Sequence, residues 1–360
     1  MSKTKILLLP PFSSGGILSG AIVALNIFSK LNSFYDFSIL LDKPNLDPIQ
    51  NKLLTSFKIK PASRTKLKIF FTLIKAIKVS KQNNFIICYS DYFHSVLFSY
   101  IVSLISGRKL IIMIHIFNNF ASHKLIYKIA FNHSIALLVL KNEETLVKIS
   151  PYIRGKEMYI FENGIEDYFL NQFKENHNNY EYLCIFIGRL EQRKGLEYMK
   201  KIYLKLAKKL PNSKLLIMYG TSKKEAVCEI KEYFSNNGII NNIILVGMVS
   251  RETLVNNYID RSKVCVVTSL YEGFSLSIAE VIARGVPVVC FDLPFTKLLG
   301  DAIIKVPFPD TDAFVETIVR LDKEGFPDSE RERIRKFALE NFSFERAARI
   351  MHSNLNECLK

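Results

Sequence analysis

A strand, a loop with one glycine and a helix follow one another in the stretch Val264-Cys265-Val266-Val267-Thr268-Ser269-Leu270-Tyr271-Glu272-Gly273-Phe274-Ser275-Leu276-Ser277-Ile278-Ala279-Glu280. The strand is apolar at every position up to Val267, which is typical of a parallel strand that is buried on both faces. A helical pattern begins near Ser275, directly after the loop. This strand-loop-helix order is the repeating unit of an α/β fold.

The same unit recurs along both halves of the chain. Short apolar runs alternate with helical patterns at residues 5–9, 37–41, 85–88, 110–114, 136–140, 182–187, 214–218, 243–246, 264–267 and 286–289. An Asn-rich polar segment at 171–179 interrupts the series and has the composition of a linker. We therefore predict two doubly wound, Rossmann-like domains at 1–170 and 181–330, with a linker at 171–180. Residues 331–360 are expected to form helices that pack back towards the first domain.

Composition narrows the class of protein. The chain has 360 residues, of which 49% are hydrophobic, so it is not largely disordered. No apolar run has the length and flanks of a signal peptide or a membrane-spanning helix. The six cysteines lack metal-ligand or redox spacing, so we expect buried free thiols in a reducing compartment. The formal net charge is +15, and residues 1–170 hold 21 basic and 10 acidic residues, which predicts an anionic partner for the first half.

The loop and helix start of the quoted stretch form a candidate anion site. Backbone N–H groups at a helix start beside a glycine favour a phosphate or diphosphate. Glu272 lies just before that start and Glu280 lies further along the helix, so the two carboxylates can reach two parts of one ligand. The alternative is that both are ordinary acids at a helix start and on a helix surface.

A second candidate site follows the first strand of the second domain, in the stretch Phe186-Ile187-Gly188-Arg189-Leu190-Glu191-Gln192-Arg193-Lys194-Gly195. Arg189 and Lys194 flank a turn between a strand and a helix. The arginine suits a phosphate as a planar fork and the lysine suits it as a point charge. The alternative is a pair of solvated basic residues on a loop.

Taken in order, these stretches resemble those of a family 4 glycosyltransferase over nearly the whole chain. The resemblance rests on Gly15-Gly16, Asn163-Gly164-Ile165-Glu166, Gly188-Arg189-Leu190 with Lys194-Gly195, Glu272-Gly273-Phe274 with Glu280, and Gly285-Val286-Pro287-Val288-Val289. It implies the GT-B type of α/β fold, with two doubly wound Rossmann-like domains facing a central cleft. The first domain is then the acceptor side, and the second binds a nucleotide-sugar.

The resemblance also implies roles for single residues. Arg189 and Lys194 match the residues that hold the donor diphosphate and stabilise the leaving group, so both are expected to be catalytic. Glu272 matches the catalytic glutamate at the donor sugar, and Glu280 matches the glutamate at the ribose hydroxyls. The remaining expected donor-binding residues are Gly15, Gly16, Gly273, Phe274 and Ser275. The family needs no metal ion or other cofactor besides the nucleotide-diphosphate sugar, and transfer proceeds with retention of configuration.

His115 directly follows the apolar run 110–114, at the carboxyl edge of the predicted sheet. It matches the histidine that the family places beside the donor sugar, so we expect it to orient sugar hydroxyls or stabilise the transition state. The alternative is a structural role, which is common for a lone histidine after an apolar strand.

Residues 64–81 predict a basic amphipathic helix. Its apolar residues fall on one face, and Lys68, Lys75 and Lys78 lie off that stripe; the apolar positions are 67, 70, 71, 74 and 77. Either this helix packs on the core with solvated lysines, or it docks on an anionic membrane surface. The second reading suits an acceptor that is linked to a lipid.

We therefore predict a retaining glycosyltransferase that moves a hexose-type sugar from a nucleotide-diphosphate sugar to an acceptor hydroxyl. The acceptor is expected to be a lipid-linked or cell-surface glycan, and the protein to be cytoplasmic or peripheral at the inner face of the cell membrane. The alternatives are a sugar-nucleotide epimerase on the same GT-B fold, a phosphorylase and an inactive relative. A nucleic-acid binder would rest on net charge alone, so no nucleic acid is expected as a partner.

Overall fold

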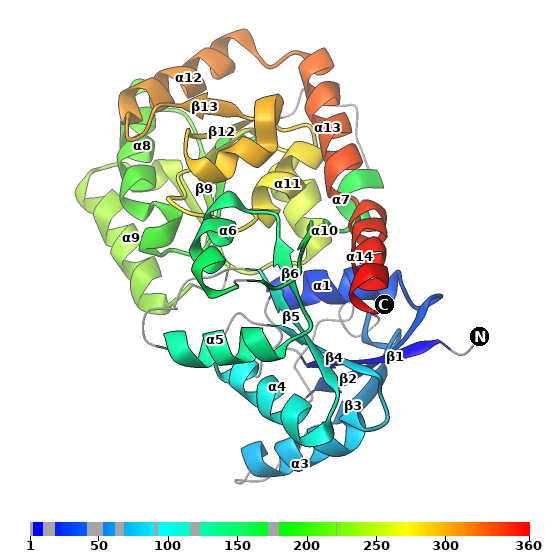
Figure 1. Ribbon diagram of the computed structural model, residues 1–360. Coiled ribbons are helices and arrows are strands. Elements are labelled where there is room, and N and C mark those ends of the chain that lie inside the picture. Colours follow the sequence, from blue (N-terminus) through cyan, green and yellow to red (C-terminus); the bar gives the residue numbers. More distant parts are fainter. Residues whose placement is uncertain are drawn as a thin grey trace. The chain divides into compact units, whose positions relative to one another are not determined.

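The computed structural model describes residues 3–9, 19–41, 53–61, 68–89, 93–115, 123–153, 155–171, 180–220 and 222–360. The chain divides into two compact units, which are drawn in Figure 1. Unit 1 comprises Met1–Gly164 with Phe344–Lys360, and unit 2 comprises Ile165–Ser343. The division falls after Gly164, six residues before the predicted end of the first domain at 170. Most of the predicted linker, residues 172–179, lies outside the described residues.

Unit 1 holds a parallel sheet whose seven described strands run in the order β3-β2-β1-β4-β5-β6-β7. The strand order reverses between β1 and β4. The chain therefore continues from β1 towards one edge of the sheet and from β4 towards the other edge. Its elements are β1 (Thr4–Leu9), α1 (Ser19–Ser29), β2 (Tyr35–Leu41), β3 (Lys58–Pro61), α3 (Lys68–Ser80), β4 (Phe85–Tyr89), α4 (Phe93–Ser106), β5 (Lys109–Ile114), α5 (Lys124–His133), β6 (Ala136–Leu140), α6 (Glu143–Ile149), β7 (Met158–Phe161) and α14 (Phe344–Cys358).

Unit 2 holds a second parallel sheet, with six described strands in the order β10-β9-β8-β11-β12-β13. Here the order reverses between β8 and β11. The main elements are α7 (Asp167–Asn171), β8 (Tyr182–Ile187), α8 (Leu196–Lys209), β9 (Leu215–Met218), α9 (Lys224–Asn236), β10 (Ile243–Val246), α10 (Arg251–Thr253), β11 (Ser262–Val267), α11 (Leu276–Ala283), β12 (Val288–Phe291), β13 (Ile304–Val306), α12 (Thr311–Glu324) and α13 (Asp328–Phe342). Short helical turns span Gln192–Lys194 (η2) and Pro294–Ala302 (η5).

The central strands form where the sequence is apolar without interruption. In β5 and β11, the residues Leu110–Ile114 and Val264–Val266 are buried almost completely, because helices cover both faces of each sheet. Three strands were not predicted, namely β3, β7 and β13. Each lies at an edge of its sheet, where one side lacks a neighbour and exposed residues interrupt the apolar run.

The C-terminal helices belong to different units. Helix α13 packs on α11 within unit 2, whereas α14 packs on α1 and β7 within unit 1. Within unit 1, the Asn354 side-chain amide donates to the Ile160 carbonyl at 2.8 Å, and Arg346 pairs with Glu162 at 2.9 Å. Helix α14, near the end of the chain, therefore belongs to unit 1, which also contains the beginning of the chain.

Helix α3 covers the later part of the predicted helix 64–81, since residues 62–67 lie outside the described residues. In this part the predicted apolar face is divided between core and surface, and its residue Ile77 packs partly buried against the core of unit 1. The buried face carries Thr72, Ala76 and Val79, at a spacing of four and three, while Phe71 and Ile74 are 44% and 37% exposed. Helices α3, α4 and α5 lie side by side in unit 1 (Figure 1), and Ala76 and Val79 of α3 belong to the same buried cluster as Val96 and Val102 of α4.

Candidate functional site

The strand order of unit 2 places two loops next to each other at the carboxyl ends of β8 and β11. These strands are neighbours, and the chain leaves them towards opposite edges of the sheet. Loops at such a reversal diverge above the sheet and leave room for a ligand. Both stretches singled out from the sequence, the one around Arg189 and Lys194 and the one around Glu272, lie in these loops.

The backbone of the two loops is in direct contact at Gly195. This residue has φ +67°, and an added Cβ would lie 1.8 Å from the Thr268 carbonyl oxygen. Only glycine allows this approach, because it both tolerates the left-handed conformation and lacks the clashing atom. The Thr268 hydroxyl donates to the Lys194 carbonyl at 2.8 Å, and the Leu270 N–H donates to the Arg193 carbonyl at 2.9 Å. These bonds hold the turn that carries Lys194 against the loop that carries Glu272.

Glu272 is the centre of an ion-pair cluster between the two loops. Its carboxylate accepts hydrogen bonds from Lys194 Nζ at 2.5 Å, from the Ser269 hydroxyl at 2.7 Å and from Arg193 Nη1 at 3.0 Å. Burial works to raise the pKa of Glu272, but the ammonium, the guanidinium and the hydroxyl outweigh it and hold the pKa below its usual value. Glu272 is therefore ionised at neutral pH although it is only 4% exposed.

Arg189 is connected to this cluster through Glu191. The Glu191 carboxylate lies 3.1 Å from Arg189 and 3.2 Å from Arg193, and Arg193 in turn pairs with Glu272. The Arg189 side chain is exposed, whereas Lys194 is mostly buried. The structure thus joins Arg189, Lys194 and Glu272 in one chain of ion pairs.

Arg193 was not among the predicted site residues. It precedes Lys194 directly and also donates to the Tyr271 carbonyl at 3.0 Å. Its basic character is visible in the sequence, but its partner Glu272 stands 79 residues away, and only the contact of the two loops shows the pairing.

The helix start predicted near Ser275 is present. Helix α11 begins at Leu276, and Ser275 occupies the N-cap position without accepting a side-chain hydrogen bond from the first turn. Gly273, Phe274 and Ser275 line a small hollow beside Glu272, which is closed on the other side by Phe295, Leu298 and Leu299 of η5. These apolar residues of η5 were not predicted to lie near the site.

Glu280 lies on α11 and is 5% exposed. It has its own basic partner, because Arg251 Nη1 donates to Glu280 Oε1 at 3.1 Å. Burial raises the pKa of Glu280 to about 7, against the effect of the Arg251 charge and with a smaller contribution from Glu166. The two predicted carboxylates therefore sit in two different ion-pair clusters of unit 2.

His115 follows β5 at the carboxyl edge of the sheet of unit 1 and is 3% exposed. Its ring lies tilted against that of Tyr89, with centroids 4.4 Å apart, and makes a T-shaped contact with Phe161 at 4.8 Å. Burial lowers the pKa of His115 to about 3, although Asn163 acts in the opposite direction, so the imidazole is neutral at physiological pH. Among the described residues, neither ring nitrogen has a hydrogen-bond partner.

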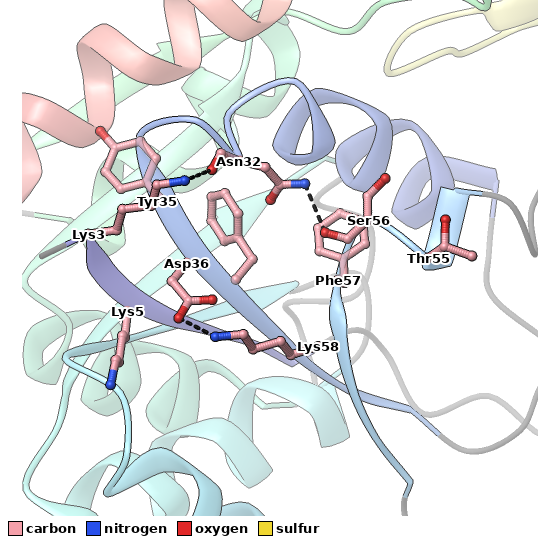
Figure 2. Close-up of a pocket in the computed structure, with 10 residues that line it drawn as sticks. Lys3, Lys5, Asn32, Tyr35, Asp36, Thr55, Ser56, Phe57 and Lys58 are labelled. Atoms are coloured by element: carbon pink, nitrogen blue, oxygen red, sulfur yellow. Dashed lines mark hydrogen bonds and ion pairs between the residues drawn. The ribbon is translucent and has the colours of Figure 1, made fainter.

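The other predicted residues of the first domain, Gly15 and Gly16, lie outside the described residues. Unit 1 also has a hollow of about 540 Å³, which Figure 2 shows with Lys3, Lys5, Asp36 and Lys58 around it. These residues stand at the amino ends of β1, β2 and β3, whereas His115 follows the carboxyl end of β5. The hollow therefore lies at the opposite edge of the sheet from the loops expected to meet a ligand.

Two further searches concern only the part of the chain that the structure describes. In these residues, no three His, Cys, Asp or Glu side chains come together as a group that could hold a metal ion. None of the helices in the same residues combines the length and the apolar composition needed to cross a bilayer.

The comparison with protein families gives a match within unit 2. Residues 167–340 match the family described as "Glycosyl transferases group 1". An uncharacterized glycosyltransferase of Methanocaldococcus jannaschii is 26% identical over 153 residues, which are 42% of this chain and 35% of that protein. The poly(glycerol-phosphate) alpha-glucosyltransferase of Bacillus subtilis is 26% identical over 171 residues, which are 47% of this chain and 24% of that protein. The matches thus span about a quarter to a third of the length of these relatives.

Solved structures resemble the chain over almost its full length. The HepE protein of Anabaena, solved in complex with UDP and glucose, has a TM-score of 0.76 at 15% identity and covers 98% of this chain and 100% of that chain. The sucrose-phosphate synthase of Thermosynechococcus elongatus has a TM-score of 0.77 at 16% identity and covers 99% of both chains. These structures confirm the predicted GT-B fold, and the family match over residues 167–340 confirms the resemblance to glycosyltransferases.

Proposed function

We propose that the chain is a retaining glycosyltransferase that uses a nucleotide-diphosphate sugar, because residues 167–340 match the glycosyl transferases group 1 family. The sugar is a hexose, and it moves to an acceptor hydroxyl. The observation that carries this proposal is the cluster of Lys194, Arg193 and Glu272 at the strand-order reversal of unit 2. It combines phosphate-binding cations with a carboxylate that can accept hydrogen bonds from sugar hydroxyls.

The diphosphate is assigned to the loop after β8 and the start of α11. Arg189 and Lys194 supply positive charge, and the free backbone N–H groups at the start of α11 supply donors aimed out of the helix. The bond between the anomeric carbon and the diphosphate oxygen breaks in the reaction, so negative charge grows on the leaving group. Fixed cations stabilise that charge without reorganising at the moment of reaction.

The donor's two sugars are assigned to the two carboxylates. Glu272 is ionised and held by three donors, so its position is set before the donor arrives. A carboxylate in this state accepts hydrogen bonds from the hydroxyls of the transferred sugar. Glu280, further along α11, accepts hydrogen bonds from the ribose hydroxyls.

His115 of unit 1 is assigned to the transferred sugar as well. Its neutral imidazole has one donor and one acceptor nitrogen, neither makes a hydrogen bond of good geometry to a described residue, and Asn163 is the neighbouring side chain that acts on its pKa. Such a group can bridge two sugar hydroxyls. Its low pKa argues for a role in hydrogen bonding and against one as a charged acid.

The acceptor is proposed to be a lipid-linked or cell-surface glycan met at the inner face of the cell membrane. Support comes from α3, where exposed Phe71 and Ile74 stand close in sequence to Lys75 and Lys78, and no acidic residue occurs in the helix. Apolar side chains with lysines beside them suit the boundary between acyl chains and anionic headgroups. The exposed apolar pairs Leu104 with Ile105 on α4 and Leu125 with Ile129 on α5 extend this character to neighbouring helices.

The donor is tested first by thermal shift with UDP-, GDP- and ADP-sugars, with the free diphosphates as controls. A nucleotide-sugar that binds the native state raises the melting temperature by mass action. The transfer is then tested with that donor and a lipid-linked acceptor, with the anomeric configuration of the product read by NMR. Conversion of the sugar without any acceptor would indicate an epimerase, and an inverted product would refute retention.

The membrane surface is tested by sedimentation with phosphatidylglycerol vesicles. The variant Lys75→Glu/Lys78→Glu is expected to bind more weakly, since each lysine near an anionic surface is worth about 1 kcal/mol. The variant Phe71→Ser/Ile74→Ser removes the two exposed apolar side chains of α3 and is also expected to bind the vesicles more weakly. Lys208→Glu/Lys209→Glu on α8 of unit 2 is the matched control. Equal binding of all variants would refute docking through α3.

A further inference from the structure

Glu280 shares its arginine with a second carboxylate. The Nη1 atom of Arg251 donates to Glu280 at 3.1 Å, and the Nε atom of the same guanidinium lies 3.5 Å from Glu166 Oε1. The guanidinium carbon stands 5.7 Å from the centroid of the Phe169 ring on α7. One cation therefore faces two acids and an aromatic ring, and Glu280 is the more deeply buried of the two acids.

The backbone around this arginine is well anchored on both sides. Arg251 is the first residue of α10, where the Ser250 hydroxyl caps the helix by accepting the Thr253 N–H at 3.1 Å. On the other side, the N–H of Ile165, next to Glu166, donates to the Phe342 carbonyl at 2.8 Å. Backbone hydrogen bonds therefore hold both the segment that carries Arg251 and the segment that carries Glu166.

Other charged residues around α11 are directed elsewhere. Helix α11 packs on α7, α13 and β12. On α13, Arg331 donates to the Gly285 carbonyl at 3.0 Å and Arg335 to the Leu170 carbonyl at 3.5 Å. Helix α7 carries Asp167, and β12 has no charged residue. Among the described residues, the charges that act on Glu280 are those of Arg251 and Glu166.

We propose that Arg251 is a positioning residue that holds Glu280 ionised and directed at the ribose hydroxyls of the donor, while Glu166 competes for the same guanidinium. This inference rests on the proposed function, in which Glu280 contacts the ribose. An ionised carboxylate accepts both hydrogens of a hydroxyl pair, whereas a protonated one has lost part of that capacity. The two neighbours of Glu280 therefore act in opposite directions: loss of Arg251 disfavours the ionised form, and loss of Glu166 favours it.

The ionisation is measured without any donor. The full chain is labelled with ¹³C at the glutamate carboxyl, titrated from pH 5 to 9 by NMR, and the Glu280 signal is assigned by its absence in Glu280→Gln. Burial places the Glu280 pKa at about 7, inside this range. We expect the midpoint to rise by about one pH unit in Arg251→Met and to fall in Glu166→Gln.

The matched control is Arg261→Met. This change breaks another arginine–glutamate pair of unit 2, in which Arg261 lies 2.9 Å from Glu181 just before β11, and it should leave the Glu280 midpoint unchanged. If Arg251→Met does not fold, Arg251→Lys keeps the charge and loses the fork, with a smaller rise expected. Identical midpoints in wild type, Arg251 variants and Glu166→Gln would overturn the proposal.

The positioning role is measured by binding of UDP-glucose over the same pH range. Wild-type affinity should fall roughly tenfold as pH drops through the Glu280 midpoint, as expected for a lost hydrogen bond to a charged group. The fall should move to higher pH in Arg251→Met and to lower pH in Glu166→Gln. Binding that is independent of pH and of both substitutions would overturn the role. If wild type binds none of the UDP-, GDP- and ADP-sugars but the carboxyl midpoints shift, the proposed function is wrong and the electrostatic pairing stands.

Discussion

Glu272 and Glu280 are buried to nearly the same extent in one loop and helix, yet their pKa values shift in opposite directions. Glu272 receives hydrogen bonds from an ammonium, a guanidinium and a hydroxyl. Glu280 accepts a hydrogen bond from the guanidinium of Arg251, and this guanidinium also pairs with Glu166. Because burial raises the pKa of both carboxylates, the difference between them comes from their hydrogen-bonding partners. A buried glutamate here stays ionised when it has several donors of its own, and loses charge more easily when it shares its only cation with another acid.

The largest effect is expected at the buried lysine of the Glu272 cluster. Lys194→Met removes a cation from the leaving diphosphate and the strongest partner of Glu272, so turnover should fall roughly 10²–10³-fold. Single-turnover kinetics with the donor found by thermal shift measure the loss. Lys205→Met on α8, which breaks an exposed pair with Asp312, is the control and should retain activity. Near-normal turnover of Lys194→Met would refute the assignment of the donor diphosphate to the loop that carries Lys194.

The contact of the two loops is tested at Gly195. Gly195→Ala places a Cβ against the Thr268 carbonyl and also imposes a left-handed residue, so it should destabilise unit 2 by roughly 2 kcal/mol or more. Gly220→Ala is matched, because Gly220 has φ +54° but no atom within 4 Å of an added Cβ. Only the cost of its conformation, about 1 kcal/mol, is expected there. Equal melting temperatures of the two variants would show that the loops are free to separate.

The pH dependence of stability should differ in sign between the two glutamates. The lowered pKa of Glu272 stabilises the fold above the usual carboxyl pKa of 4.5, and this contribution is lost as pH falls through the folded value. The raised pKa of Glu280 carries a cost that is complete above about pH 7 and absent below 4.5. At pH 8, Glu272→Gln should therefore destabilise the fold, and Glu280→Gln should stabilise it by on the order of 1–3 kcal/mol.

Chemical denaturation at pH 8 and pH 4.5 measures these two changes. The stabilisation by Glu280→Gln should be largely lost at the lower pH, where the carboxyl is protonated in the folded state and half protonated in the unfolded chain. Parallel behaviour of the two variants across this range would contradict the contrast between the clusters.

The smallest effect is expected at Arg193. Its side chain is partly exposed, so solvent screens its pairing with Glu272, and Lys194 and Ser269 remain in Arg193→Met. The loss of stability should stay near 0.5–1 kcal/mol, with turnover lowered a few-fold. The melting temperatures of Arg193→Met and Lys194→Met, measured side by side, show which of the two cations contributes more to stability. A loss as large as that of Lys194→Met would show that Arg193 is the main partner of Glu272.

Much of the site could be predicted from local patterns. Arg189, Lys194 and Glu272 stand in short stretches directly after apolar strands, where glycines mark tight turns, and such stretches can be recognised without a structure. Arg193 and Arg251 could not be assigned in the same way. Their carboxylate partners stand 79 and 29 residues away, and no local spacing connects them.

The predicted helix at 64–81 shows a second limit. The apolar stripe through Phe71 and Ile74 fits a helix face, but so does the stripe through Thr72, Ala76 and Val79, and the structure buries the latter. Both stripes have helical periodicity. Which one faces the core depends on the shape of α4 beside it, and this is a property of packing.

The sequence by itself determined which strands are central and which polar residues follow their carboxyl ends, because apolarity and spacing are local properties of a chain. The tertiary structure alone decided which charges meet. In the folded chain, Glu272 accepts hydrogen bonds from three donors, and Glu280 shares Arg251 with Glu166. The two His115 nitrogens lack a described hydrogen-bond partner, and Phe71 and Ile74 of α3 are exposed. The physical reason is that electrostatic and packing energies depend on distances through space, which the order of residues does not contain.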